Sequence, residues 1–214
     1  MAPGPWRHGP GALLSRARGA GPYTAERPRT QLKGRAQDMS GSTSGAAGEE
    51  RTSPPLTGGE RETLRAYLDF HRETLAMKCE GLSDEQLRRA SSPPSTLSLL
   101  GLVRHMAEVE RAWFRRTIDG EDVPLVWSDA GDFQAAYDAS ASTRAEAFAA
   151  WQAEVAHARR IEREAASLDV TGHQVRWGED VSLRVVMLHL IHEYARHNGH
   201  ADFLREAIDG TTGA

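Results

Sequence analysis

The chain has 214 residues, a net charge of −4 at pH 7 and a single cysteine. One cysteine excludes a disulfide framework and a cysteine-rich zinc site, and we interpret Cys79 as a small buried apolar residue near a helix end. No apolar stretch is long enough to span a membrane or to act as a secretory signal. We therefore expect a cytoplasmic protein with no membrane partner.

Residues 1–38 differ from the rest of the chain in composition and charge. They carry seven basic and two acidic side chains and are rich in Gly, Pro, Ala and Arg without apolar periodicity. Such a segment cannot bury enough surface to offset its chain entropy. We expect residues 1–55 to be disordered and residues 56–214 to form one domain. Residues 39–214 then carry −9, which argues against a nucleic-acid surface.

The basic leader has two interpretations. An Arg-rich, acid-poor segment is typical of a transit peptide. Alternatively, Met39 opens a short polar lead-in, and residues 1–38 are then translated upstream sequence that belongs to no mature protein.

Two long helices are predicted in the first half of the domain. Thr57 and Glu60 have the spacing of a capping box and open a helix over about 58–80, which ends before Gly81. A polar link with its own SDEQ cap leads to a second helix over about 96–118, whose apolar side chains recur on one face.

Two further helices are predicted after a long connection over about 119–142, in which DFQAAYDAS has the pattern of a short helix. The third helix runs from about 143 to 168, and Ser182 caps a fourth that ends near 208; residues 169–180 between them are a loop or a small hairpin. The pattern predicts an all-α four-helix bundle with a long crossover connection.

The segment HLIHEYARHNGH, from His189 to His200, places four histidines and a glutamate on one helix. Glu193 and His197 are four residues apart, so their Cβ atoms stand roughly 5–6 Å apart and both side chains can reach one metal ion. His197 also occupies a core position where packing alone favours leucine. His105, beside the apolar stripe of the second helix, is the candidate third ligand.

Each of these residues also has a purely structural interpretation. A histidine on a half-apolar helix face is commonly a hydrogen-bonded core residue, whereas Glu193 next to apolar neighbours is costly to desolvate without a partner. His200 and His189 are open to three roles: metal ligand, partner of a ligand, or surface residue. The remaining histidines have no surrounding constellation of this kind: His8, His71, His157, His173 and His192.

Two imidazoles and one carboxylate suit Zn²⁺ and leave a coordination position free, as catalytic zinc sites do. The same ligand set also serves Fe(II), and Ni²⁺ or Mn²⁺ fits it as well, so the residues do not select one metal.

Two stretches of the chain, STLSLLGLVRHMAEVERAWFRR and SLRVVMLHLIHEYARHNGHADFLREAIDGTTG, resemble the DinB-like superfamily. Within it, the similarity is to the domain of unknown function 664, also labelled mini-circle protein, over about residues 57–213. The resemblance implies a bundle with a long crossover and one metal held by His105, Glu193 and His197. Many relatives carry histidine in place of Glu193, and the glutamate resembles the mycothiol-dependent maleylpyruvate isomerase branch. His200 departs from the glutamine of several relatives and, as a fourth ligand, would close the site.

Characterised members of this superfamily use a low-molecular-weight thiol, mycothiol or bacillithiol, as metal-dependent S-transferases or isomerases. The resemblance therefore implies a small-molecule thiol and an electrophile as partners, and it leaves a homodimer open. Two other hypotheses compete with an S-transferase: a bundle that binds metal or a partner without turnover, and an oligomeric helical protein whose histidines are only packed.

Overall fold

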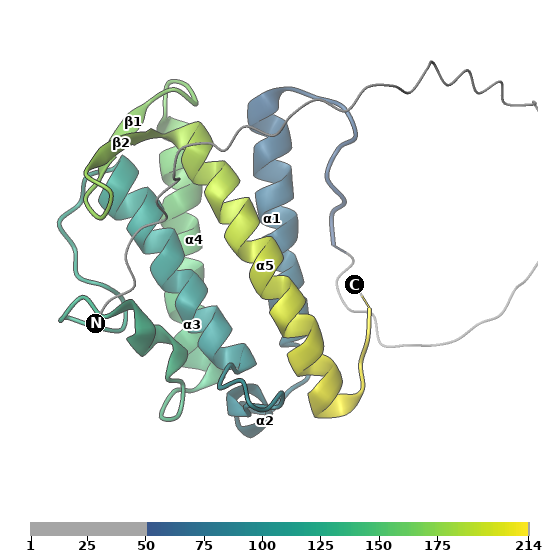
Figure 1. Cartoon of the computed structure of the whole chain (residues 1–214). Helices are drawn as coiled ribbons and strands as arrows, with labels where there is room; N and C mark the ends of the chain where they lie inside the picture. Colours follow the sequence, from purple (N-terminus) through teal and green to yellow (C-terminus); the bar gives the residue numbers. More distant parts are fainter. Residues whose placement is uncertain (1–50, 214) are drawn as a thin grey trace, which may run out of the picture. The chain divides into compact units, whose positions relative to one another are not determined.

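The computed structural model describes residues 51–213 and shows four long helices packed as a bundle (Figure 1). Their bounds are α1 (Glu60–Lys78), α3 (Leu99–Glu110), α4 (Arg144–Glu164) and α5 (Leu183–Asp209). Helix α1 packs against α5, α3 packs against α4, and α3 also contacts α5. The predicted helical bundle is confirmed. The disorder expected for the N-terminal segment falls, up to residue 50, outside the described residues.

Helix α3 continues without a break into η1 (Arg111–Ile118), a π-helical segment that the sequence pattern did not distinguish from α-helix. After η1 the chain returns along α3, where the Arg104 guanidinium donates to the carbonyl of Ala136 at 2.9 Å. The backbone N–H of Arg144, at the start of α4, donates to Oδ1 of Asp84, which lies in the link that leads to α3. Helices α3 and α4 therefore start at the same end of the bundle, joined by the predicted crossover.

Four shorter elements complete the domain: α2 (Asp84–Arg88), the 3-10 helix η2 (Phe133–Tyr137), β1 (Thr171–Gln174) and β2 (Glu179–Ser182). Strands β1 and β2 form an antiparallel hairpin with Thr171 opposite Ser182. The segment between the last two helices is therefore a hairpin, and the connection contains the short helix that its pattern predicts. None of the helices in residues 51–213 is long and apolar enough to cross a membrane.

Side-chain caps mark the starts of four α-helices within residues 51–213. Ser83 and Ser182 each accept a hydrogen bond from a backbone N–H in the first turn, as predicted, and Ser98 and Thr143 cap α3 and α4 in the same way. The capping box predicted from Thr57 and Glu60 is wrong, because α1 starts after Gly59 and has no side-chain cap. Glu60 is engaged elsewhere: its carboxylate pairs with Arg184 of α5 at 2.7 Å.

The apolar core lies between the helices and includes residues from all four. Among its fully or almost fully buried side chains are Leu68, Leu75, Leu99, Leu102, Met106, Phe114, Ala158, Leu183, Met187 and Leu190. Cys79 is fully buried at the end of α1, as the sequence predicts.

A hydrogen-bonded network crosses this core. The carboxylate of Glu110, on α3, has no exposed surface and accepts hydrogen bonds of 2.8 and 2.7 Å from Arg72 of α1. Tyr194 of α5 donates to Glu110 Oε1 at 2.7 Å, and Trp151 Nε1 of α4 donates to the Tyr194 hydroxyl at 2.7 Å. Each of the four helices thus contributes one side chain, and the buried carboxylate is fully paired.

Replacing Arg72 with alanine should destabilise the protein by about 3–5 kcal/mol, because Glu110 is then left as an unpaired buried charge. Arg159→Ala is the matched control, because Arg72 and Arg159 both pair with Asp69. The Arg159 side chain is 44% exposed, so its loss should cost at most about 1 kcal/mol. Urea unfolding followed by circular dichroism measures both. Equal effects of the two substitutions would contradict a structural role for the buried pair.

Candidate metal centre

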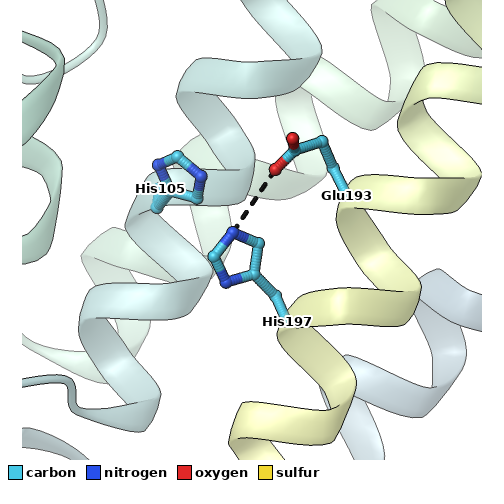
Figure 2. Close-up of side chains that lie close together, drawn as sticks. All are labelled: His105, Glu193 and His197. Carbon is cyan, nitrogen blue, oxygen red and sulfur yellow. Dashed lines mark ion pairs between the residues drawn. The ribbon is translucent and has the colours of Figure 1, made fainter. Parts of the chain in front are cut away.

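His105 of α3 and the Glu193 and His197 side chains of α5 converge at the seam between the two helices (Figure 2). The two helices run antiparallel at this seam. His105 lies opposite His197, and Trp113, about two turns after His105 and within η1, lies opposite His189. His197 Nε2 is 3.4 Å from Glu193 Oε2. His197 is 2% exposed and the Glu193 side chain 18% exposed, so the group is buried on one side and reaches the surface on the other.

The ligand atoms of these three residues lie within 4.8 Å of one another. In a tetrahedral zinc site with bonds of about 2.1 Å, two ligand atoms stand about 3.4 Å apart. The three ligand atoms therefore need to close by at most roughly 1.4 Å to share an ion, which side-chain rotation can supply.

Two buried nitrogens of the group, His105 Nδ1 and His197 Nε2, have no hydrogen-bond partner within residues 51–213. A buried imidazole nitrogen without a partner is costly. In addition, the lone pair of a neutral His197 Nε2 would face a carboxylate, an arrangement that is favourable only with a proton or a metal cation between the two atoms. The donor set therefore fits a divalent metal.

The charge states suit metal binding. Burial, followed by the neighbouring charge of His197, lowers the pKa of His105 to about 4, so its imidazole is neutral at pH 7. The contact with His197 lowers the pKa of Glu193 to about 2, so its carboxylate is ionised. A neutral imidazole and a carboxylate are the forms that ligate divalent ions.

His200 and His189 lie on either side of this group. His200 Nδ1 is 3.3 Å from His197 Nδ1, the ring nitrogen other than the one beside Glu193. With the proton of this contact on His197 Nδ1, the contact orients the His197 ring and Nε2 carries the lone pair that a metal needs. His189 Nε2 is 3.8 Å from Glu193 Oε1, and burial lowers the pKa of His189.

Tyr137, from the crossover, stacks on the His105 ring with 4.5 Å between ring centroids and 16° between planes. The close approach depends on Gly101, one helical turn before His105. A Cβ at Gly101 would lie 2.7 Å from the Tyr137 carbonyl oxygen and would push the crossover away from α3. Tyr137 could not be identified from the sequence, because the path of the crossover over α3 is a tertiary feature that local periodicity does not contain.

Trp113, in η1, lies on the apolar face predicted for the helix over about 96–118. Trp113 is indeed buried, but its ring packs on His189 at 4.2 Å between centroids. Of the histidines set aside on sequence grounds, His173 pairs with Asp180 on the hairpin and His71 contacts Asn198. His8 lies outside the described residues.

A bundle of this topology, with one histidine on α3 and a glutamate and histidine four residues apart on α5, defines a DinB-like helical domain. A profile of the mycothiol-S-transferase family matches residues 63–210, and the chain belongs to this family. The resemblance drawn from the two quoted stretches is confirmed.

One solved structure, described as a conserved protein from Enterococcus faecalis, has a TM-score of 0.53 and 15% sequence identity to the chain. The match covers 72% of this chain and 100% of that one. At this identity the likeness shows the fold alone. None of the curated proteins matches the chain.

Replacing His105 with alanine should weaken zinc binding by at least about tenfold, because it removes one of three donors while leaving α3 intact. His192→Ala, an exposed change next to Glu193 on α5, should leave zinc affinity unchanged. Competition with a chromophoric chelator measures both affinities, and circular dichroism checks helicity. Unchanged zinc affinity in the His105 variant would exclude this residue as a ligand.

His200→Ala should weaken zinc binding by about tenfold, because His197 loses the contact that orients its ring. The same chelator competition distinguishes this role from direct ligation. Direct ligation would make the loss for His200→Ala equal to that for His105→Ala, whereas an orienting contact makes it the smaller of the two.

Proposed function

We propose that the protein is a metal-dependent S-transferase that joins a low-molecular-weight thiol, mycothiol in the first instance, to an electrophile. The observation that carries this proposal is the convergence of His105, Glu193 and His197, with two buried imidazole nitrogens lacking partners, in a member of the mycothiol-S-transferase family. The proposed ligands are these three residues, and zinc is the proposed metal, with Ni²⁺, Fe²⁺ and Mn²⁺ compatible with the same donors.

A divalent ion in such a site supplies a Lewis acid that lowers the pKa of a thiol and so provides thiolate near neutral pH. Three residues of the chain would hold the ion. His105 and His197 would supply imidazole donors and Glu193 a carboxylate, and three protein donors leave room for a further group. The Tyr137 ring stacks on His105, and the buried Trp113 ring packs on His189, which lies beside Glu193.

In the proposed transfer, each bond that forms is matched by a bond that breaks. The thiol loses its proton to solvent, the sulfur lone pair forms a bond to the electrophilic carbon, and the bond from that carbon to the leaving group breaks, with the leaving group taking the electron pair. The protein orients the sulfur and the carbon, and no oxidant or reductant takes part.

The test is conjugation of mycothiol to monobromobimane, which releases bromide and becomes fluorescent. Zinc-loaded protein should accelerate the reaction over the uncatalysed rate, and His105→Ala should reduce the rate to near that background. His192→Ala should retain the wild-type rate, since this side chain is exposed and outside the group. Metal content is measured on the same samples.

A sample that binds stoichiometric zinc but accelerates neither this reaction nor one with a second electrophile would support a bundle that binds metal without turnover. A sample without metal affinity would contradict both that bundle and the S-transferase.

A further inference from the structure

Trp177 lies in the turn of the β1–β2 hairpin and is 51% exposed. Single apolar side chains on a surface are ordinary, and Val175, on the same turn, is 79% exposed. Trp177 differs from Val175 because its ring packs onto side chains that lead to the candidate metal centre.

These side chains form a continuous row. The Trp177 ring packs edge-on against Trp113, with centroids 5.0 Å apart and planes at 62°, and against His189, at 6.3 Å and 88°. His189 Nε2 in turn lies 3.8 Å from Glu193 Oε1. One imidazole therefore separates the exposed indole from a proposed metal ligand.

The hairpin is held against η1. Gln174 donates to Thr117 Oγ1 at 3.1 Å, and a Cβ at Gly172 would lie 1.8 Å from the Thr117 carbonyl oxygen, so the backbones are in direct contact. Within the turn, the backbone N–H of Trp177 donates to Gln174 O at 3.1 Å. The indole is thus fixed before any ligand arrives, which lowers the entropic cost of binding to it.

We propose that the exposed face of Trp177 binds the sugar portion of the thiol co-substrate and so selects mycothiol over smaller thiols; this rests on the function proposed above. Mycothiol is N-acetylcysteine joined through an amide to an amino sugar, which carries an inositol. The C–H faces of such rings are apolar and pack on a flat indole, while the indole N–H can donate to a ring hydroxyl.

Distance favours the thiol over the electrophile as the occupant. The electrophilic carbon must approach the sulfur to about 3–3.5 Å, so a small electrophile stays beside His105, Glu193 and His197. The sugar ring follows the sulfur after five bonds, a reach of roughly 6 Å at ordinary bond lengths. The path from Glu193 to the indole has two steps, 3.8 Å from Glu193 Oε1 to His189 Nε2 and 6.3 Å between the His189 and Trp177 ring centroids. The sugar ring and the inositol beyond it extend past the five-bond reach, so they are the part of the thiol that arrives at Trp177.

The experiment is equilibrium binding of mycothiol and of N-acetylcysteine, measured by calorimetry on the full-length, zinc-loaded protein. Trp177→Ala should raise the Kd for mycothiol about tenfold and leave that for N-acetylcysteine within about twofold. Trp177→Phe should recover most of the mycothiol affinity. Val175→Ala, on the same turn, should bind both thiols as the wild type does, and all variants should keep the wild-type zinc content and melting temperature.

Equal Kd values for mycothiol in wild type and Trp177→Ala would overturn the proposal, and so would an equal rise for both thiols. A rise only in the KM of the electrophile, with thiol binding unchanged, would assign the indole to the electrophile and also overturn it. The proposed function can fail on its own. Wild-type protein that binds mycothiol through Trp177 but transfers it to no electrophile would contradict the S-transferase and leave the role of Trp177 standing. A Trp177→Ala variant with the wild-type transfer rate and mycothiol affinity would contradict the role of Trp177 and leave the S-transferase standing.

Discussion

The buried charge pair between Arg72 and Glu110 determines how the four helices can be arranged. Its carboxylate is completely removed from water, so it requires the guanidinium of α1 and the Tyr194 hydroxyl of α5 at the same time. Sliding α5 by one turn against α3 would move Tyr194 by about 5.4 Å and leave a buried charge incompletely paired. Leucine and methionine contacts tolerate such a shift far better than a hydrogen-bonded carboxylate does.

This register matters for the metal centre because the two features share backbone. Tyr194 follows Glu193 directly, and Glu110 lies little more than one helical turn beyond His105. The interaction that aligns Tyr194 with Glu110 therefore also aligns Glu193 and His197 with His105. The core face of α5 carries the polar network and the adjoining face carries the proposed donors, so positional accuracy in the core is passed to the seam.

Much of this arrangement could be predicted from the sequence, since helical periodicity is local. It located the four helices and the pair Glu193 and His197 on one face, and cap patterns also identified Ser83 and Ser182. The position of His105 beside the apolar stripe of its helix made it the candidate third ligand, and the resemblance to a known family implied the same three residues. The convergence is now seen, while binding of a metal by these residues stays a prediction.

Other features escaped because they depend on contacts between distant parts of the chain. Thr57 and Glu60 have the spacing of a cap, yet Glu60 pairs with Arg184, more than a hundred residues away. Tyr137 and Trp177 sit in connections, where sequence patterns specify turns but not the surface against which a turn lies. The π-helical geometry over Arg111–Ile118 also escaped, because the order of apolar and polar residues there does not distinguish a π-helix from an α-helix.

The contact of Gly172 with the Thr117 carbonyl divides the hairpin into two parts with different freedom to vary. Any side chain at Gly172 would lift both strands from η1, so the strand residues near this contact are constrained by steric exclusion. In the turn beyond it, Val175 to Gly178, the Trp177 ring packs on Trp113 and His189. A substitution in that turn can therefore change the surface beside the seam without the backbone clash that a side chain at Gly172 would cause.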